Sequence, residues 1–481
     1  MRIVLYNYAQ PDEDEGGGVR IYQQNLANAL TGLGHTVILL SSGLRYALGA
    51  SAFVRYRKDA FLRAEIVNSP VVAPAPDTFY GLRDYNQGLG LDHIPDLLRA
   101  EYGVVDVFHF QNLEGLTRRF FPKLRAAFPA AQMLYSVHNY NLVCPQVHLW
   151  FQDREVCVDF KDGEACTKCL VGFARRPHHR QVRPVEEMLV RRGLTRKSIV
   201  VRAARRATRY LAQSAATIAD GGRRWTGKAP APTADAAMYR DFRQGNIELC
   251  NEFFDSLLAV SERTRDQLIQ RGVRPDRVAV SYIGTAHKQT FLQSVPITSA
   301  ETLHLGYLGY VRRDKGFFFL LDALESLPEE IAGRMELTIA AATKEPIVLD
   351  RIKALANRFK AVIHHNGFTH DTLEQVLAPV NLGIVPVLWE DNLPQVAIEF
   401  VSHGIPIVTS DRGGAGEIAN NPEFSFKAGD IPSLHERLKA ISTALHSLGT
   451  FWTQAPRIYS MEEHVAELMQ FYRPARRAAV A

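Results

Sequence analysis

The chain has 481 residues, of which 46% are hydrophobic and 22% are charged, with 24 prolines and 33 glycines. This length allows two or three domains with their own cores, and the composition is ordinary for a soluble globular protein. The sequence contains no run of 18 apolar residues, which argues against a membrane-spanning helix. Its start, Met1 to Tyr6, is too short and then too polar for a signal peptide, so we expect a cytoplasmic protein.

The first 40 residues predict a strand, a glycine-rich turn, a helix and a second strand. Ile3 to Tyr6 is apolar, residues 16–18 are glycines, and apolar residues from Tyr22 to Leu33 recur at helical spacing. Further short apolar strands are expected at 104–110, 133–137 and 257–260. Alternation of such strands with helices predicts a parallel α/β sheet.

A second series of strands is expected from residue 278 onward. The candidates are 278–283, 303–308, 337–341, 361–364, 382–387 and 405–409, and an amphipathic helix follows at 461–472. Two Rossmann-like halves leave a cleft between the carboxyl ends of their sheets, where such folds bind ligands. We place the N-terminal domain at 1–265, the C-terminal domain at 266–460, and at 461–481 a helical segment that packs back on the N-terminal domain.

The segment from Trp389 to Glu399 carries the strongest functional signal. It places two carboxylates eight residues apart, Asp391 in a turn and Glu399 on the helix that the turn opens. A helix start offers unpaired backbone N–H groups and a positive dipole end, which suit a diphosphate. A carboxylate two turns into the helix can accept hydrogen bonds from sugar hydroxyls. The segment therefore indicates a nucleotide-sugar site.

Six segments in this order resemble the family 4 glycosyltransferases of the GT-B fold. They are Gly17-Gly18 with the helix up to Gly34-His35, the histidine segments 106–112 and 136–139, Asp255 to Ser261, Gly309 to Gly316, and Asp391 to Glu399. The resemblance implies two Rossmann-like domains facing each other across a cleft. It also implies transfer of a sugar from a nucleotide-sugar donor on the C-terminal domain to an acceptor on the N-terminal domain, with retention and without a catalytic metal.

The resemblance assigns the donor residues of the carboxylate segment. Glu399 would accept hydrogen bonds from the ribose hydroxyls, and its apolar flanks argue against a merely solvated glutamate. The amides around Asn392, Leu393, Pro394 and Gln395 would bind the diphosphate, with Pro394 pre-setting the first helical turn.

Asp391 is a departure, because the family usually has Glu at this position to contact the transferred sugar. Aspartate is shorter by one bond of roughly 1.5 Å. Two alternatives stay open: Asp391 is a helix N-cap, or Glu390 takes its role with a shifted turn.

Lys315 would be the cation beside the leaving diphosphate, since a point charge offsets the negative charge that develops there. A surface lysine before a helix is the alternative. The family usually has an arginine directly after the loop glycine, where this chain has Tyr310, so Arg312 or Arg313 would replace it.

The N-terminal domain contributes a glycine pair and a histidine. Gly17 and Gly18 would let the backbone approach a phosphate or the acceptor closely, unless the turn needs them for its geometry alone. His138 stands where the family has a histidine facing the transferred sugar, so the catalytic set would be His138, Asp391 and Lys315. His109 is the weaker candidate, and strand-end histidines often have purely structural partners.

Four of the five cysteines, Cys144, Cys157, Cys166 and Cys169, fall within residues 144–169 and end in a Cys-x2-Cys pair. This composition fits a structural tetrahedral zinc site, although only one pair has the spacing of zinc ribbons. Reduced buried thiols and disulfides are the alternatives.

A basic insert follows the cysteines at 171–245. Residues 171–240 contain 16 Lys and Arg against four Asp and Glu, and Arg202, Arg205, Arg206 and Arg209 fall on one helical face. Such helices lie on the inner face of an anionic membrane or bind a lipid-diphosphate, whereas a solvated helix covering the N-terminal domain is the alternative. Nucleic acid is not expected as a partner, because no aromatic residues interleave the arginines.

The expected function is therefore glycosyl transfer to a glycan or lipid-diphosphate-linked acceptor in surface polysaccharide or glycolipid synthesis. Two rivals remain. One is a GT-B sugar-nucleotide epimerase. The other is a partner protein in glycan assembly that has lost catalytic turnover, an alternative that stays open because Tyr310 and Asp391 depart from the family pattern.

Overall fold

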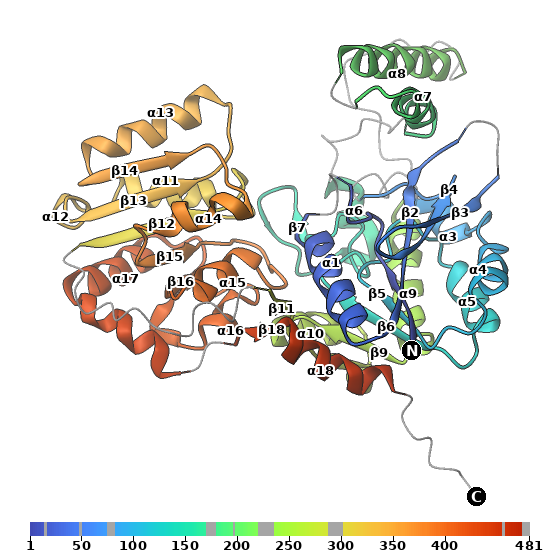
Figure 1. Ribbon diagram of the computed structural model, residues 1–481. Coiled ribbons are helices and arrows are strands. Elements are labelled where there is room, and N and C mark those ends of the chain that lie inside the picture. The colour runs from blue at the N-terminus through green and yellow to red at the C-terminus, as the bar shows by residue number, and fades with distance from the viewer. Residues whose placement is uncertain are drawn as a thin grey trace, which may run out of the picture.

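The computed structural model describes residues 1–13, 17–47, 51–74, 82–169, 179–195, 198–219, 235–286, 302–454 and 457–473. Within this part, two parallel sheets with their covering helices form two α/β bodies, which are seen side by side in Figure 1. Parts of the predicted basic insert, the end of the 461–481 segment, and Asp14 and Glu15 before the glycines lie outside the described residues.

The N-terminal sheet has eight strands in the order β10-β9-β6-β5-β1-β2-β4-β3. They are β1 (Arg2–Tyr6), β2 (Thr36–Arg45), β3 (Phe53–Lys58), β4 (Leu62–Val67), β5 (Val107–Phe110), β6 (Gln132–Val137), β9 (Ser256–Ala259) and β10 (Val278–Val280). Every pair is parallel except the edge pair of β3 with β4. Of the central strands, β5 is buried along its whole length and β1 is buried after its half-buried first residue, Arg2, as their apolar runs predict.

Helices of this half surround the sheet, and a long excursion lies between β6 and β9. The helices are α1 (Gly17–Gly32), α3 (Leu82–Gln87), α4 (Ile94–Tyr102), α5 (Phe120–Ala127), α9 (Ala236–Glu252) and α10 (Glu262–Ile269), with a 3-10 turn at Pro275–Arg277. The excursion contains the hairpin β7 (Trp150–Phe151) and β8 (Glu155–Val156), a 3-10 turn at Lys161–Gly163, and the helices α6 (Glu164–Cys169), α7 (His179–Arg191) and α8 (Ile199–Ala219).

The C-terminal sheet has six parallel strands in the order β14-β13-β12-β15-β16-β17. They are β12 (Leu303–Leu308), β13 (Met335–Ala340), β14 (Ala361–His365), β15 (Leu382–Val385), β16 (Ile407–Ser410) and β17 (Ser425–Phe426). Its helices are α11 (Phe317–Glu325), α12 (Glu329–Ala332), α13 (Pro346–Ala354), α14 (His370–Leu377), α15 (Gln395–Ser402), α16 (Ala415–Ala419) and α17 (Ile431–Thr443), with 3-10 turns at Leu355–Asn357, Pro422–Phe424 and Leu445–Thr453.

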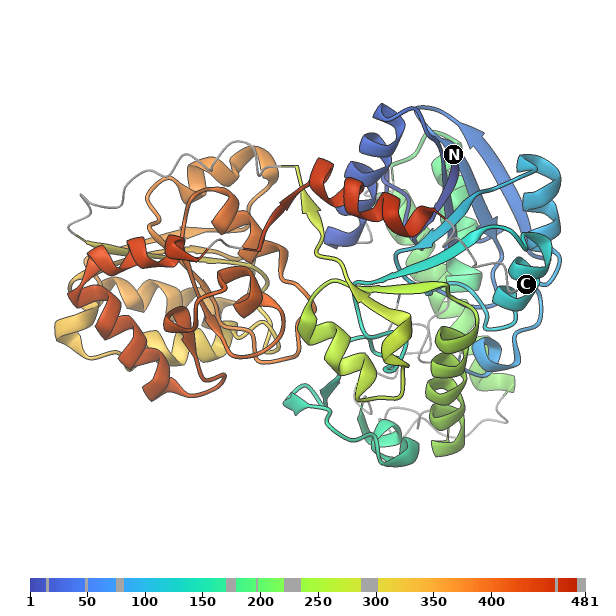
Figure 2. The ribbon, with the colours of Figure 1, turned by 90° about the horizontal axis from the view of Figure 1, so that it is seen from below.

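The chain passes between the two halves twice, at one place. The short strands β11 (Gly284–Thr285) and β18 (Tyr459–Ser460) pair in parallel there. Helix α18 (Met461–Tyr472) then lies on the N-terminal half against α1, as Figure 2 shows. His464 of α18 bonds Tyr22 (Nε2–Oη 2.6 Å), and Tyr472 bonds His109 (Oη–Nδ1 2.8 Å).

One predicted strand belongs to the other sheet. The strand expected at 278–283 is the shorter β10, and it pairs with β9 in the first sheet instead of opening the second. The prediction is wrong here because apolar residues mark a strand without naming its pairing partner. The first sheet therefore continues past residue 265, where we placed the boundary. The strands β3 and β4 were not anticipated, because charged residues interrupt their apolar pattern.

Candidate active site

Both sheets have a switch point, where the strand order reverses direction from a central strand. In the C-terminal sheet it lies between β12 and β15, and in the N-terminal sheet between β1 and β5. The loops after these strands define the crevice in which open α/β sheets bind ligands. Every predicted donor residue comes from the loop after β12, from the loop and helix after β15, or from the start of α1, the helix that follows β1.

The first two of these loops bring Lys315 and Asp391 together. The ammonium Nζ of Lys315 lies 2.6 Å from Oδ2 of Asp391 and 5.1 Å from the ring centroid of Trp389. The loop that contains Lys315 can lie this close to the loop after β15 because residue 316 is a glycine. Gly316 has φ +73°, and a Cβ added to it would lie 1.7 Å from the carbonyl oxygen of Pro386. A half-buried cation is thus held at the switch point of the C-terminal sheet.

The structure excludes one alternative for the turn before α15 and corrects the expected place of Pro394. Asp391 is not the helix N-cap, because the helix begins at Gln395 and Pro394 precedes it with an extended backbone (ψ 119°). Pro394 therefore stands one residue before the first helical turn and does not lie inside it. The carboxylate of Asp391 is directed to Lys315 and not to the helix amides.

Glu390 is the neighbour that could have replaced Asp391, and its carboxylate is already occupied. It is almost fully buried, accepts two bonds from Arg263 of α10 (both 2.6 Å), and lies 3.0 Å from Nη1 of Arg412. Burial alone would raise the pKa of Glu390, but Arg263 and Arg412 lower it below its ordinary value. The residue joins the two halves of the molecule and is not available to a sugar.

We expect Glu390→Gln to lower the free energy of unfolding by about 2–3 kcal/mol, because it leaves Arg263 and Arg412 without their carboxylate. Since the pKa of Glu390 is lower in the folded than in the unfolded protein, this stabilisation is present above the ordinary carboxyl pKa and is lost as the pH falls through the lowered value. Urea unfolding at pH 7 and pH 4 measures both effects. Glu374→Gln on the exposed face of α14 is the control, and equal stability of the two variants at pH 7 would contradict the prediction.

Glu399 presents the opposite situation, a buried carboxylate without a partner. Its Oε2 has no hydrogen-bond partner among the residues that the structure describes, and burial raises the pKa of Glu399 to about 7. A buried charged oxygen left unpaired is costly, so native proteins rarely retain one without a use. The geometry leaves room for hydroxyl donors that the chain itself does not supply.

The N-terminal half meets this segment through the glycine pair. Gly17 has φ +49°, a conformation that favours glycine, and a Cβ on Gly18 would lie 2.2 Å from Oε1 of Gln395. Gly18 thus touches the first residue of α15 across the cleft. The glycine pair lies at the helix start, where unpaired backbone N–H groups face outward.

His138 lies on the same side, at the end of β6. Its Nε2 is 2.8 Å from Oε1 of Gln111, its ring centroid is 4.9 Å from that of Tyr22, and the preceding carbonyl of Val137 accepts from Nδ2 of Asn392 at 3.5 Å. Burial, and then His464, lower the pKa of His138 to about 3, so the imidazole is neutral at neutral pH. It can exchange a hydrogen bond with a sugar hydroxyl but is not a resident acid.

Other predicted residues are engaged elsewhere. Asn392 is buried and accepts from Oγ of Ser261 at 2.7 Å through its carbonyl, and Leu393 is buried among apolar residues. His109 is also fully buried, between Tyr472 and Ser136, which makes it a structural histidine.

The second cation predicted for the donor is less well placed. Arg312 forms a two-point ion pair with the buried Asp314 (2.9 and 2.7 Å), and Arg313 is mostly exposed, with its guanidinium carbon 5.6 Å from the ring centroid of Phe318. Tyr310 is exposed as well. Lys315 is therefore the predicted cation that faces the carboxylate segment directly.

His148 is a site residue that the sequence did not reveal. It comes from the loop between Cys144 and Cys157, and its ring centroid lies 4.9 Å from that of Trp389. Burial lowers the pKa of His148 to about 3, with contributions from Arg312 and Lys315, whereas Asp391 opposes them. No local motif marks it, because only the tertiary structure brings this loop to Lys315 and Asp391.

The four cysteines gather on the same excursion. Burial raises the pKa of Cys144 to about 12, and the thiols of Cys157 and Cys169 contribute to that shift. Arg243 and Arg271 face the cluster and oppose the rise in the pKa of Cys157. Among the residues that the structure describes, no group of three or more His, Cys, Asp or Glu side chains is arranged to hold a metal ion. Structural zinc therefore stays a prediction from the sequence.

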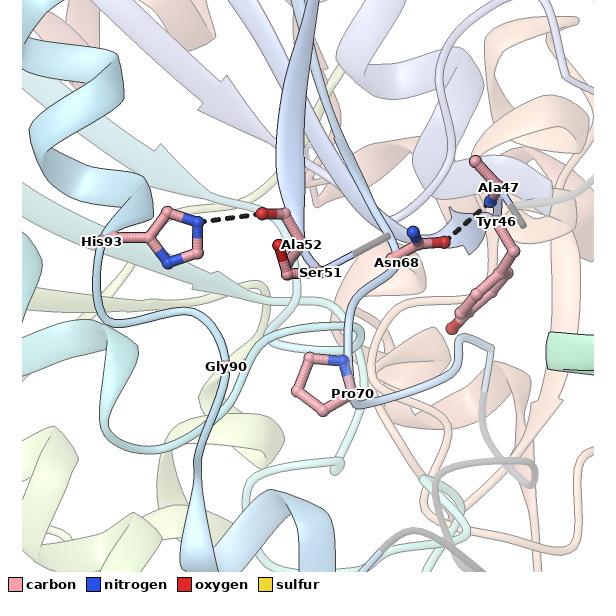
Figure 3. A pocket seen from close by; sticks show the side chains of 8 residues that line it. All are labelled: Tyr46, Ala47, Ser51, Ala52, Asn68, Pro70, Gly90 and His93. Atoms are coloured by element: carbon pink, nitrogen blue, oxygen red, sulfur yellow. Dashed lines mark hydrogen bonds between the residues drawn. The ribbon is translucent and has the colours of Figure 1, made fainter. Parts of the chain in front are cut away.

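A separate cavity of about 630 Å³ opens in the N-terminal half, beyond the ends of β2 and β4 (Figure 3). Tyr46, Asn68, Pro70 and His93 are among its lining residues. Asn68 accepts from the backbone of Ala47 (2.7 Å), and Nε2 of His93 lies 2.8 Å from the carbonyl of Ala52, so two polar side chains are fixed in its wall.

The fold and part of the sequence are similar to known proteins. Residues 302–443 match the family model described as glycosyl transferases group 1. Sucrose-phosphate synthase from Thermosynechococcus elongatus has a similar fold over 98% of both chains, with a TM-score of 0.57 and 17% identity. A UDP-forming α,α-trehalose-phosphate synthase from Burkholderia xenovorans, solved with glucose-6-phosphate, gives a TM-score of 0.56 at 11% identity over 98% of this chain and 100% of that chain.

HepE from Anabaena, solved with UDP, gives a TM-score of 0.52 at 14% identity over 98% of this chain and 100% of its own. No curated protein sequence matches the chain. These findings define the fold of the protein. It has two Rossmann-like domains arranged as in the GT-B fold, and its C-terminal domain matches the group 1 glycosyltransferase model over residues 302–443.

Proposed function

We propose that the protein is a nucleotide-sugar-dependent glycosyltransferase that acts with retention of configuration. The observation that carries this proposal is Oε2 of Glu399, a buried carboxylate oxygen that no described residue bonds, on the helix whose start meets Gly18 of the N-terminal half. A ribose with two adjacent hydroxyls would supply the missing donors, and the amides at the start of α15 would receive the diphosphate. The similar structures of HepE with UDP and of the UDP-forming synthase support a uridine diphosphate donor as the first to test.

The chain's residues then divide the chemistry between them. Lys315 would move from Asp391 toward the leaving diphosphate and offset its developing charge, and Asp391 would be freed to accept a hydroxyl of the transferred sugar. Neutral His138 would hold another hydroxyl from the opposite side. Departure and attack on the same face need positioning and no protein nucleophile.

The acceptor would approach from the N-terminal domain, where the cavity of Figure 3 offers a polar and apolar lining. We propose a glycan or a lipid-diphosphate-linked acceptor, in surface polysaccharide or glycolipid synthesis at the cytoplasmic side of a membrane. Among the described residues, no helix is long and apolar enough to cross a membrane.

Turnover of UDP-sugars without an acceptor tests whether the chain is an active enzyme or a degenerate partner protein that has lost turnover. We expect slow release of UDP, and a rise in the unfolding temperature with the matching nucleoside diphosphate, because a ligand that binds only the folded state stabilises it. NMR of the released sugar, with the α anomer appearing first from an α-linked donor, would support retention. Stabilisation by a nucleotide without any turnover would indicate the degenerate partner, and release of an epimerised sugar would indicate an epimerase.

A further inference from the structure

The helix pair α7–α8 lies outside the candidate site and has α8 as its outermost element (Figure 1). The contacts that hold α7 to the N-terminal domain include Arg55 Nη1 to Glu187 Oε1 at 2.8 Å and Arg183 Nη1 to the carbonyl of Leu44 at 2.8 Å. Helix α8 packs on α7 in turn. One side of α8 therefore faces the protein, and the other faces outward.

Among the side chains of α8 that the structure describes, which lie within residues 199–211, the outward side is apolar. Ile199, Tyr210 and Leu211 are 75%, 71% and 67% exposed, and Val200 is 54% exposed. With the exposed Ala203 and Ala207 they fall within about one third of the helix circumference, while Val201, on the inner side, is fully buried. A helix on a water-facing surface normally has the opposite pattern, so an apolar stripe of this length marks a docking face.

The charge of α8 indicates what docks there. Arg202 and Arg206 are exposed along one edge of the apolar stripe, and the 21 residues of α8 include no Asp or Glu. The complementary surface must therefore be anionic along that edge and must accept apolar side chains beside it.

We propose that this face of α8 binds an anionic lipid surface. The interfacial region of a bilayer meets both requirements, because it takes apolar side chains at the acyl boundary and pairs arginines with phosphates a few ångströms away. Nucleic acid would pair with the arginines but would leave the apolar stripe in water. The anchor of α7 at Leu44 lies two residues before Tyr46, so the membrane would lie beside the cavity of Figure 3. Only the suggestion that the membrane lies beside the acceptor cavity rests on the proposed function.

Co-sedimentation of the full chain with vesicles tests the proposal. We expect binding to phosphatidylcholine vesicles that contain phosphatidylglycerol, loss of this binding as the salt concentration rises, and little binding to phosphatidylcholine alone. Arg202→Ser/Arg206→Ser should weaken binding roughly 10- to 100-fold. Tyr210→Ser/Leu211→Ser should weaken it to a similar extent at any salt concentration, because it removes the apolar contribution.

The control is Leu33→Ser/Val104→Ser, which replaces two exposed apolar residues elsewhere on the N-terminal half and should bind like the unmodified protein. Nucleotide-induced thermal stabilisation, which depends on the distant donor residues, should persist in all three variants and shows that they fold. Absence of binding to anionic vesicles, or equal binding to neutral ones, would overturn the proposal. If the protein does not bind anionic vesicles, a protein partner for the apolar stripe would be the next hypothesis to test. Neither result would bear on UDP-sugar turnover.

Discussion

Glu399→Gln is expected to lower kcat/KM for the nucleotide-sugar by roughly 100- to 1000-fold, mainly through KM. Hydrogen bonds to a charged acceptor contribute about 1.5–3 kcal/mol each, and an amide cannot accept from both ribose hydroxyls as a carboxylate can. Initial-rate kinetics over the donor concentration measure the loss. Glu436→Gln, on the exposed side of α17, is the matched control and should leave the kinetics unchanged.

Glu399→Gln should also change how the free energy of unfolding depends on pH. The pKa of Glu399 is about 7 in the folded protein, against an ordinary value of 4.5, so the unliganded folded chain holds a proton that the unfolded chain has lost between these two values. The free energy of unfolding should therefore fall as the pH rises from about 4.5 to 7, by roughly 3 kcal/mol in total, and this fall should be absent in Glu399→Gln.

Donor binding should follow the opposite trend, because the ribose hydroxyls bind the ionised carboxylate. We expect the affinity for UDP to rise through pH 7 in the unmodified protein by more than it does in Glu399→Gln, which retains only the titration of the ligand's own phosphate. Calorimetric titrations at pH 6 and pH 8 compare the two. Identical pH dependence in both proteins would rule out Glu399 as the donor carboxylate.

The second large effect is expected at Lys315. Lys315→Gln should lower kcat roughly 100- to 1000-fold with a small change in KM, because the cation acts mainly on the charge that develops on the leaving diphosphate. Lys315→Arg should keep part of the rate, since it preserves the charge with a different shape. Lys439→Gln, an exposed lysine on α17, is the control.

The ion pair with Asp391 requires a second variant, because Lys315→Gln also leaves a buried carboxylate without its cation. Lys315→Gln/Asp391→Asn removes that charge and should recover most of the lost stability in urea unfolding, yet it should be at least as slow as Lys315→Gln, because it also removes the oxygen that we propose accepts a hydroxyl of the transferred sugar. Recovery of kcat in the double variant would show that Lys315 acts only by neutralising Asp391, and our assignment would then be wrong.

Much of the fold could be read from local pattern. The strand β12 and the helix α18 have the predicted bounds, and most other central strands differ by one to three residues at an end. These elements are buried on both faces or on one stripe, so their apolar residues follow the period of the backbone. The strands at or next to the sheet edges were predicted poorly: the edge strand β10 was placed in the wrong sheet, and the edge strand β3 and its neighbour β4 were missed, because the pairing of a strand depends on a partner that its own residues do not name.

For the site, the sequence by itself determined which segments we propose for the chemistry: the turn and helix from Asp391 to Glu399, the loop with Lys315, and the glycine pair. These signals are local, since helix starts, loop glycines and carboxylate spacing are properties of short stretches.

Only the tertiary structure decided which polar groups are occupied and which are free for a ligand. Adjacent Glu390 and Asp391 look equivalent in the sequence, but Arg263 from the other half takes the first and Lys315 the second. Within the described part of the chain, the same structure leaves the buried Oε2 of Glu399 without a hydrogen-bond partner and brings His148 to the candidate site from the cysteine loop. A carboxylate's role depends on what lies within a few ångströms of it, and those neighbours come from residues tens to hundreds of positions away.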